Sequence, residues 1–168
     1  MAKPEPRFSF IEVMDILGTS PARLIAVAEG RPDDELHEPL EPGGWSARDI
    51  LGHLRACQRT WSSYLVRILD EDHPRFRYVS PRSTIRQTDF LTLPYRDSVE
   101  GFAVDRERLL ARVRTLEPAD LDRTASVKVS GGRVQEHTAF SYAHRMAEHE
   151  REHVEHLERV MTSGGPTV

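Results

Sequence analysis

Apolar residues recur every three or four positions in four stretches of the chain, and this spacing predicts four helices with one buried face each. The first stretch covers residues 8–29 and the last covers residues 138–161. Ser20 and Pro21 in the first stretch are typical of a helix start, so we expect that helix to be broken or kinked there. The pattern predicts one all-α domain over residues 1–168, a four-helix bundle with a hydrophobic core.

The second helix has a well-marked start. Ser46 is a candidate N-cap, and Asp49 three residues later completes a capping box. Trp45 and Ile50 flank this cap and are spaced to pack on each other as a hydrophobic staple. The buried face follows at alternating spacings of four and three residues: Ile50, Leu54, Cys57, Trp61, Tyr64 and Ile68.

The third helix follows a long crossover, residues 71–94, in which prolines exclude a continuous helix. We expect the third helix to begin near Asp97, with Glu100 completing a second capping box. Its buried face contains one arginine among apolar residues: Val99, Phe102, Arg106, Leu109, Val113 and Leu116. Residues 124–135 alternate in polarity only briefly, so we expect a short extended turn and no sheet, because lone hairpins are marginally stable.

The fourth helix carries the most unusual pattern. Its inner row starts and ends apolar but is histidine in the middle: Tyr142, Met146, His149, His153, His156 and Val160. Histidines four apart on a helix point the same way, and neutral imidazole nitrogens bind divalent metals such as zinc. His53 lies on the buried side of the second helix. A ligand from one helix facing an i, i+4 pair on another is a common metal site in bundles, so we predict that His53, His149 and His153 bind one divalent ion.

Two other interpretations use the same residues. A single inward histidine is often a hydrogen-bonded core residue, and a histidine pair in a charged segment is often a solvated face. The segment His149 to His153 also matches the H-E-x-x-H pattern of zinc proteases, with Glu150 as general base. We discount a protease because only about 15 residues follow, too few for the usual downstream third ligand, and His156 is too close to serve.

Three further side chains are candidates for the surroundings of the site. Cys57 lies one turn beyond His53 and either approaches the metal or is a small core residue. His156 either orients a ligand imidazole or packs at the helix end. Arg106 either holds an anion near the metal or packs its stem with its charged head in water, and we favour the second role.

Composition narrows the function classes. The net charge of −4 argues against a general nucleic-acid binder, which needs a basic face. No apolar run approaches the roughly 20 residues that span a bilayer, and residues 1–6 begin no signal peptide. Cys57 is the only cysteine, so no internal disulfide forms. We therefore expect a cytoplasmic protein without membrane or nucleic-acid partners.

Two segments resemble motifs of the DinB-like superfamily. They are GWSARDILGHL at residues 44–54 and HEREHVEHL at residues 149–157. The resemblance implies an up-down-down-up bundle, often a homodimer, with nickel or zinc bound by the histidines that match His53, His149 and His153. It also implies a small-molecule substrate, since some relatives transfer or use low-molecular-weight thiols such as bacillithiol, mycothiol or glutathione.

Two classes of function follow. The first is a metal-dependent enzyme, in which three neutral nitrogen ligands leave positions open and the ion generates a thiolate or a hydroxide nucleophile. Thiol transfer is the favoured reaction because of the resemblance, and hydrolysis is the alternative. The second class is a non-enzymatic bundle whose metal is structural. Solvent access to the metal distinguishes the two classes.

Overall fold

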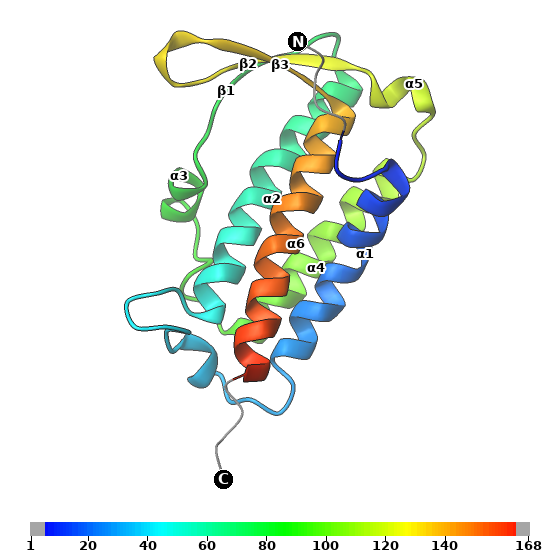
Figure 1. Ribbon diagram of the computed structural model, residues 1–168. Helices are drawn as coiled ribbons and strands as arrows, with labels where there is room; N and C mark the ends of the chain where they lie inside the picture. The colour runs from blue at the N-terminus through cyan, green and yellow to red at the C-terminus, as the bar shows by residue number, and fades with distance from the viewer. Residues whose placement is uncertain (1–5, 164–168) are drawn as a thin grey trace.

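The computed structural model describes residues 6–163, and its main feature is a bundle of four long helices (Figure 1). These helices are α1 (Phe10–Val27), α2 (Ala47–Asp70), α4 (Tyr95–Val113) and α6 (Ala139–Ser163). Each of α1 and α2 packs against both α4 and α6, so α1 and α2 lie at opposite corners. The predicted four-helix bundle is confirmed. The N-terminal segment 1–5, which bears on the signal-peptide expectation, lies outside the described residues.

The core is divided into two apolar clusters by a polar layer. One cluster contains Leu17, Cys57, Leu109 and Met146, and the other contains residues such as Leu24, Leu54, Phe102 and Val154. Along α1, α4 and α6 the two clusters lie seven residues apart, about two turns, and along α2 they lie three residues apart. The polar side chains at or next to this boundary include His53, Arg106, His149 and Glu150. The candidate chemistry therefore lies in the middle layer of the bundle.

The two predicted capping boxes have different outcomes. At α2 the Ser46 hydroxyl accepts a hydrogen bond from the Asp49 N–H at 3.1 Å, and the Asp49 carboxylate accepts one from the Ser46 N–H at 3.0 Å, as predicted. The prediction for α4 was wrong, because that helix begins earlier, at Tyr95. The Tyr95 N–H donates to the Asp33 carboxylate at 2.8 Å, so a residue distant in sequence supplies the cap.

The expected break at Ser20-Pro21 does not occur, because α1 runs continuously through Pro21. Proline lacks the N–H that would bond the carbonyl of Leu17 four residues earlier. The Arg106 guanidinium donates to that carbonyl at 2.7 Å instead. A side chain from α4 thus satisfies the group that Pro21 leaves free, which local sequence cannot reveal.

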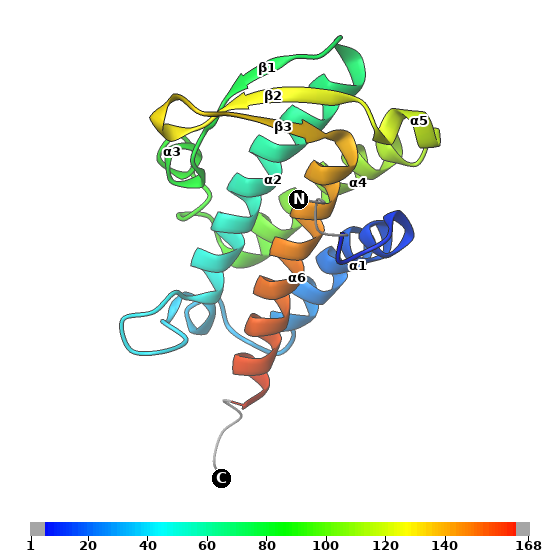
Figure 2. The same cartoon turned by 45° about the horizontal axis from the view of Figure 1, so that its top comes forward.

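The expectation of no sheet was wrong. Strands β2 (Thr124–Lys128) and β3 (Val134–Thr138) pair antiparallel, and β1 (Arg75–Arg77) from the crossover pairs parallel with β2 (Figure 2). Phe76 lies opposite Val127 in the register, and both side chains are buried. The third strand and its apolar contact stabilise the hairpin, and the partner lies about fifty residues away in sequence. The fold is therefore a helical bundle with a small mixed sheet at one end.

The crossover is long, as predicted, and contains β1 and the short helix α3 (Pro81–Arg86). The remaining short elements are the helix α5 (Pro118–Leu121) and the 3₁₀ turns Glu35–His37 and Ser130–Gly132.

The crossover passes close to α2 at Gly52, where a Cβ atom would lie 2.5 Å from Leu91 Cδ2. Within residues 6–163 no helix combines the length and the apolar character needed to cross a membrane.

Candidate metal centre

Three imidazole rings converge in the middle layer of the bundle. His53 extends from α2, and His149 and His153 extend from successive turns of α6. The Nε2 atoms of His53 and His149 lie 3.0 Å apart. The His153 ring centroid lies 5.1 Å from that of His53 and 4.6 Å from that of His149. The metal site predicted from the sequence depends on these three rings lying close together, as they do. All three side chains are half-buried.

Cys57 lies in the same cluster. Its Sγ is 3.7 Å from the Nε2 of His53. Potential ligand atoms of His53, Cys57 and His149 all lie within 4.8 Å of one another. The structure thus brings ligand atoms of His53, Cys57 and His149 together, and the His153 ring lies beside this group.

Burial keeps these imidazoles neutral. Burial, together with the charges of the neighbouring histidines, lowers the pKa of His53 to about 4 and the pKa of His149 to about 3. Burial also lowers the pKa of His153. Neutral imidazole has the free lone pair that a metal ion needs. The donor set therefore fits a divalent ion such as zinc or nickel, although imidazole alone does not select between them.

The Cys57 thiol is strongly protonated without a metal. Burial raises its pKa to about 12, and the nearby Arg145 offsets this only partly. A thiol binds a metal as the thiolate, so Cys57 would have to lose its proton to act as a ligand. A neutral imidazole meets no such requirement.

Two tryptophans flank the cluster. The Trp45 ring stacks on His153 with centroids 6.2 Å apart and contacts His53 at 5.1 Å. The Trp61 ring meets His149 edge-on at 5.0 Å. Trp45 is half exposed and covers two imidazoles, a role beyond the staple expected from the sequence. The sequence contained one sign of this role, because Trp45 directly precedes the N-cap of the helix that carries His53.

The cluster opens to a cavity of about 490 Å³. The wall combines Cys57 and His149 with residues that the sequence argument did not assign to the site: Trp61, Tyr78, Pro81, Arg145, Glu148 and Glu152. Tyr78 and Pro81 come from the crossover, whose position could not be inferred from local patterns. On the other side a smaller hollow of about 200 Å³ reaches His153 and His156.

Arg106 does not lie at this cavity. Its guanidinium forms two hydrogen bonds, of 2.7 and 2.6 Å, with the Glu150 carboxylate, and the two residues are only 1% and 3% exposed. The favoured expectation of a charged head in water was therefore wrong, because Glu150 and the Leu17 carbonyl provide internal partners. Because the Glu150 carboxylate is paired with Arg106, it is not available as the general base that a zinc protease would need.

His156 lies one turn beyond His153, and its ring is not one of the three that converge. It is half-buried and lines the small hollow beside His153. Its Nδ1 is 3.4 Å from an Arg159 nitrogen. His156 therefore borders the centre at its outer edge.

Comparison with known proteins supports the fold and the family. A solved structure described as "YfiT from Bacillus subtilis", "a probable metal-dependent hydrolase with an unusual four-helix bundle topology", matches with a TM-score of 0.79 and 21% identity, covering 96% of this chain and 93% of that one. TT2238, described as a four-helix bundle protein, matches with a TM-score of 0.60 and 18% identity, over 90% of this chain and 99% of that one. No curated protein matches the chain. The sequence model of the DinB superfamily matches residues 16–157, and the chain belongs to that superfamily.

Proposed function

We propose that this protein is a metal-dependent enzyme acting on a small molecule, with one divalent ion, zinc or nickel, held by His53, His149 and His153. The observation that carries this proposal is the convergence of three neutral imidazoles, one of which, His149, lines an open cavity. Three protein donors that leave positions open are typical of catalytic sites, whereas structural zinc sites are closed. The cavity therefore favours an enzyme over the non-enzymatic alternative.

The side chains of the cavity have distinct tasks in this proposal. When bound, a divalent ion supplies Lewis-acid chemistry and lowers the pKa of a coordinated water or thiol. Trp61 and Tyr78 offer aromatic surface to the substrate, and Arg145 offers a cation. Glu148 and Glu152 place carboxylates at the wall, where they can accept a proton from the attacking group.

Hydrolysis is the reaction that we propose first. The structural relative YfiT is described as a probable metal-dependent hydrolase, which supports water as the nucleophile. Transfer of a low-molecular-weight thiol is the second candidate. An all-imidazole donor set brings no negative charge to the ion, and the full positive charge favours a bound thiolate. The family resemblance also supports this second reaction.

We further propose an up-down-down-up course for the bundle and a homodimer. The chain course is supported by the ring order of the helices and by the crossover, which returns from the end of α2 towards the opposite end of the bundle before α4 begins (Figure 1). The homodimer follows from the family resemblance, and sedimentation analysis tests it.

Elemental analysis of untagged protein tests the site. We expect about one equivalent of metal in the wild type and none in His53→Ala or His149→Ala, with His73→Gln, in the bend before β1, as the matched control. Assays of ester hydrolysis and of thiol consumption then separate the reactions. Metal-free wild-type protein would refute the proposal, and stoichiometric metal without either activity would support the structural alternative.

A further inference from the structure

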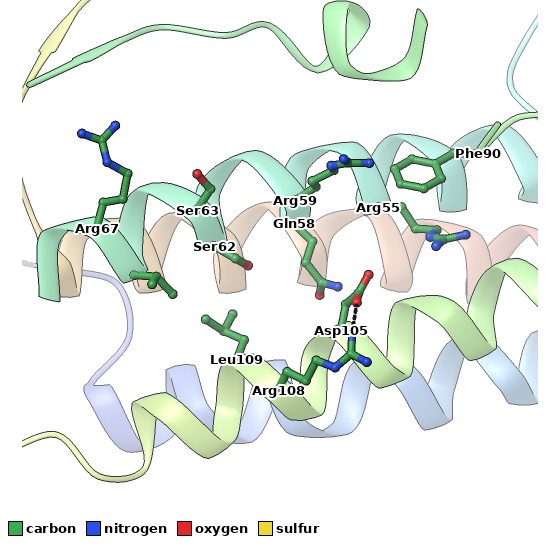
Figure 3. Close-up of a pocket in the computed structure, with 11 residues that line it drawn as sticks. Arg55, Gln58, Arg59, Ser62, Ser63, Arg67, Phe90, Asp105, Arg108 and Leu109 are labelled. Carbon is green, nitrogen blue, oxygen red and sulfur yellow. Dashed lines mark hydrogen bonds and ion pairs between the residues drawn. The ribbon is translucent and has the colours of Figure 1, made fainter. Parts of the chain in front are cut away.

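A sizeable cavity lies away from the histidines, in the groove between α2 and α4. It encloses about 630 Å³, a size typical of small-molecule sites. Figure 3 shows its side chains extending from both helices, with Phe90 of the crossover closing one end. Gln58 faces this groove, whereas its neighbour Cys57 faces the histidines, so α2 separates the two sites.

The groove is basic. Its lining contains four arginines but only one carboxylate, Asp105, which pairs with Arg108 at 3.3 Å. Arg67, on α2, pairs at 2.5 Å with Glu71, the residue that directly follows α2. Within residues 6–163, Arg55 and Arg59 form no ion pair with a carboxylate. Two guanidinium charges thus remain for an anion.

Arg55 is held in a defined position. Its guanidinium stacks on the Phe90 ring at 4.1 Å and donates to the Ser98 hydroxyl at 3.2 Å. Gly101 leaves room for it, since a Cβ there would lie 2.7 Å from an Arg55 nitrogen. Burial lowers the pKa of Arg55, and the charges of Asp105 and Asp89 offset this only partly, so its charge is poorly solvated. A bound anion would compensate for that lost solvation.

Gln58 provides a second, independent sign of a ligand. It is only 5% exposed, and its amide nitrogen donates to the Phe102 carbonyl at 3.2 Å. Its Oε1 is buried without a hydrogen-bond partner, and so is the Ser62 hydroxyl one turn further along α2. Unsatisfied buried polar atoms are costly and call for an explanation. A ligand with an N–H or O–H group would satisfy the amide oxygen.

We propose that this groove is a second ligand site, which binds a small organic anion, a carboxylate or phosphate monoester, that also carries a hydrogen-bond donor and an apolar part. Arg55 and Arg59 bind the anion, and Gln58 accepts the hydrogen bond. Val66 and Leu109 line the groove and contact the apolar part. The histidine cluster takes no part in this site.

Nuclear magnetic resonance titration of the full chain with two probes tests the proposal. Hippurate combines a carboxylate, an amide N–H and a phenyl ring, and phenyl phosphate supplies the phosphate arm. We expect at least one probe to give saturable shifts on α2 and α4 that persist when a chelator is present. The neutral amide of hippurate should not bind.

Variants decide which residues are responsible. Arg59 is exposed, so Arg59→Gln should keep the fold and weaken binding about ten-fold, as loss of a charge-assisted contact does. Gln58→Leu should weaken hippurate more than phenyl phosphate, which lacks the N–H. Arg133→Gln, an exposed arginine on the hairpin, is the matched control. Absence of saturable binding by both probes, or groove signals that move with protein concentration alone, would overturn the proposal.

Discussion

The guanidinium of Arg106 and the carboxylate of Glu150 face each other in the centre of the bundle, joined by two hydrogen bonds. Arg106 belongs to α4, and Glu150 belongs to α6 between the candidate ligands His149 and His153. A bidentate pair fixes both the rotation and the height of one helix against another. The pair therefore helps to orient the two histidines of α6 towards His53 on α2.

Removing one partner of this pair should strongly destabilise the fold. Glu150→Leu leaves the Arg106 charge buried without compensation, which costs about 3–5 kcal/mol. The double variant Arg106→Met/Glu150→Leu removes both charges and should recover much of that loss. Urea unfolding followed by circular dichroism measures both effects. A single variant as stable as the wild type would show that the pair does not form.

The third metal donor can be identified by paired substitutions. We expect His153→Ala to weaken metal binding more than about 100-fold, since even loss of a group that merely orients a ligand costs about 10–100-fold. Cys57→Ser should retain metal, because the buried thiol is protonated and His153 is the third donor in the proposed site. Competition titration with a chromophoric chelator measures both affinities. The reverse ranking of the two variants would assign Cys57 as the ligand.

Metal-free protein should lose stability as the pH falls from 7 to 5. The unfolded chain protonates its histidines near pH 6.5, whereas in the folded protein the pKa values of His53 and His149 are about 4 and about 3. The unfolded state therefore binds more protons in this range, and the free energy of unfolding decreases. Urea midpoints at several pH values measure the effect. His149→Gln should show a shallower dependence, and an unchanged slope would contradict the assignment.

Cys57 should be unreactive in the folded, metal-free protein. With its pKa raised to about 12, its thiolate fraction at pH 8 is about a thousand-fold below that of an ordinary cysteine, and the side chain is also buried. Labelling with Ellman's reagent should be slow in buffer and rapid in guanidinium chloride. Equal rates in the two conditions would show that the thiol is exposed.

The long-range contacts explain which parts of the fold were predictable. The face of α2 from Ile50 to Ile68 and the Ser46 cap follow from local spacing, and both are as predicted. The continuity of α1 through Pro21 depends on Arg106, and the start of α4 depends on Asp33. These partners lie far away in sequence, so local patterns pointed to a break in one case and to a later start in the other.

The candidate site also has a part that local spacing predicts and a part that depends on distant contacts. Helical periodicity was enough to bring His53, His149 and His153 together, because their faces are set by the buried rows of α2 and α6. Tyr78 was not predictable, since it arrives through the crossover, and Trp45 was expected only to pack on Ile50 and not on the imidazoles. Arg106 was identified as unusual from its apolar row, but its partner Glu150 had been considered only within the protease motif.

The parallel pairing of β1 with β2 ties the crossover to the connection before α6. The chain between β1 and α3 supplies Tyr78 to the cavity wall, whereas the histidines belong to the bundle helices. The part of the cavity wall that Tyr78 and Pro81 form is thus encoded apart from the histidines, whereas the rest of the wall belongs to α2 and α6. Mutation can reshape what enters the cavity while the helices that present the imidazoles stay unaltered, which is a favourable arrangement for evolving new substrates on an old centre.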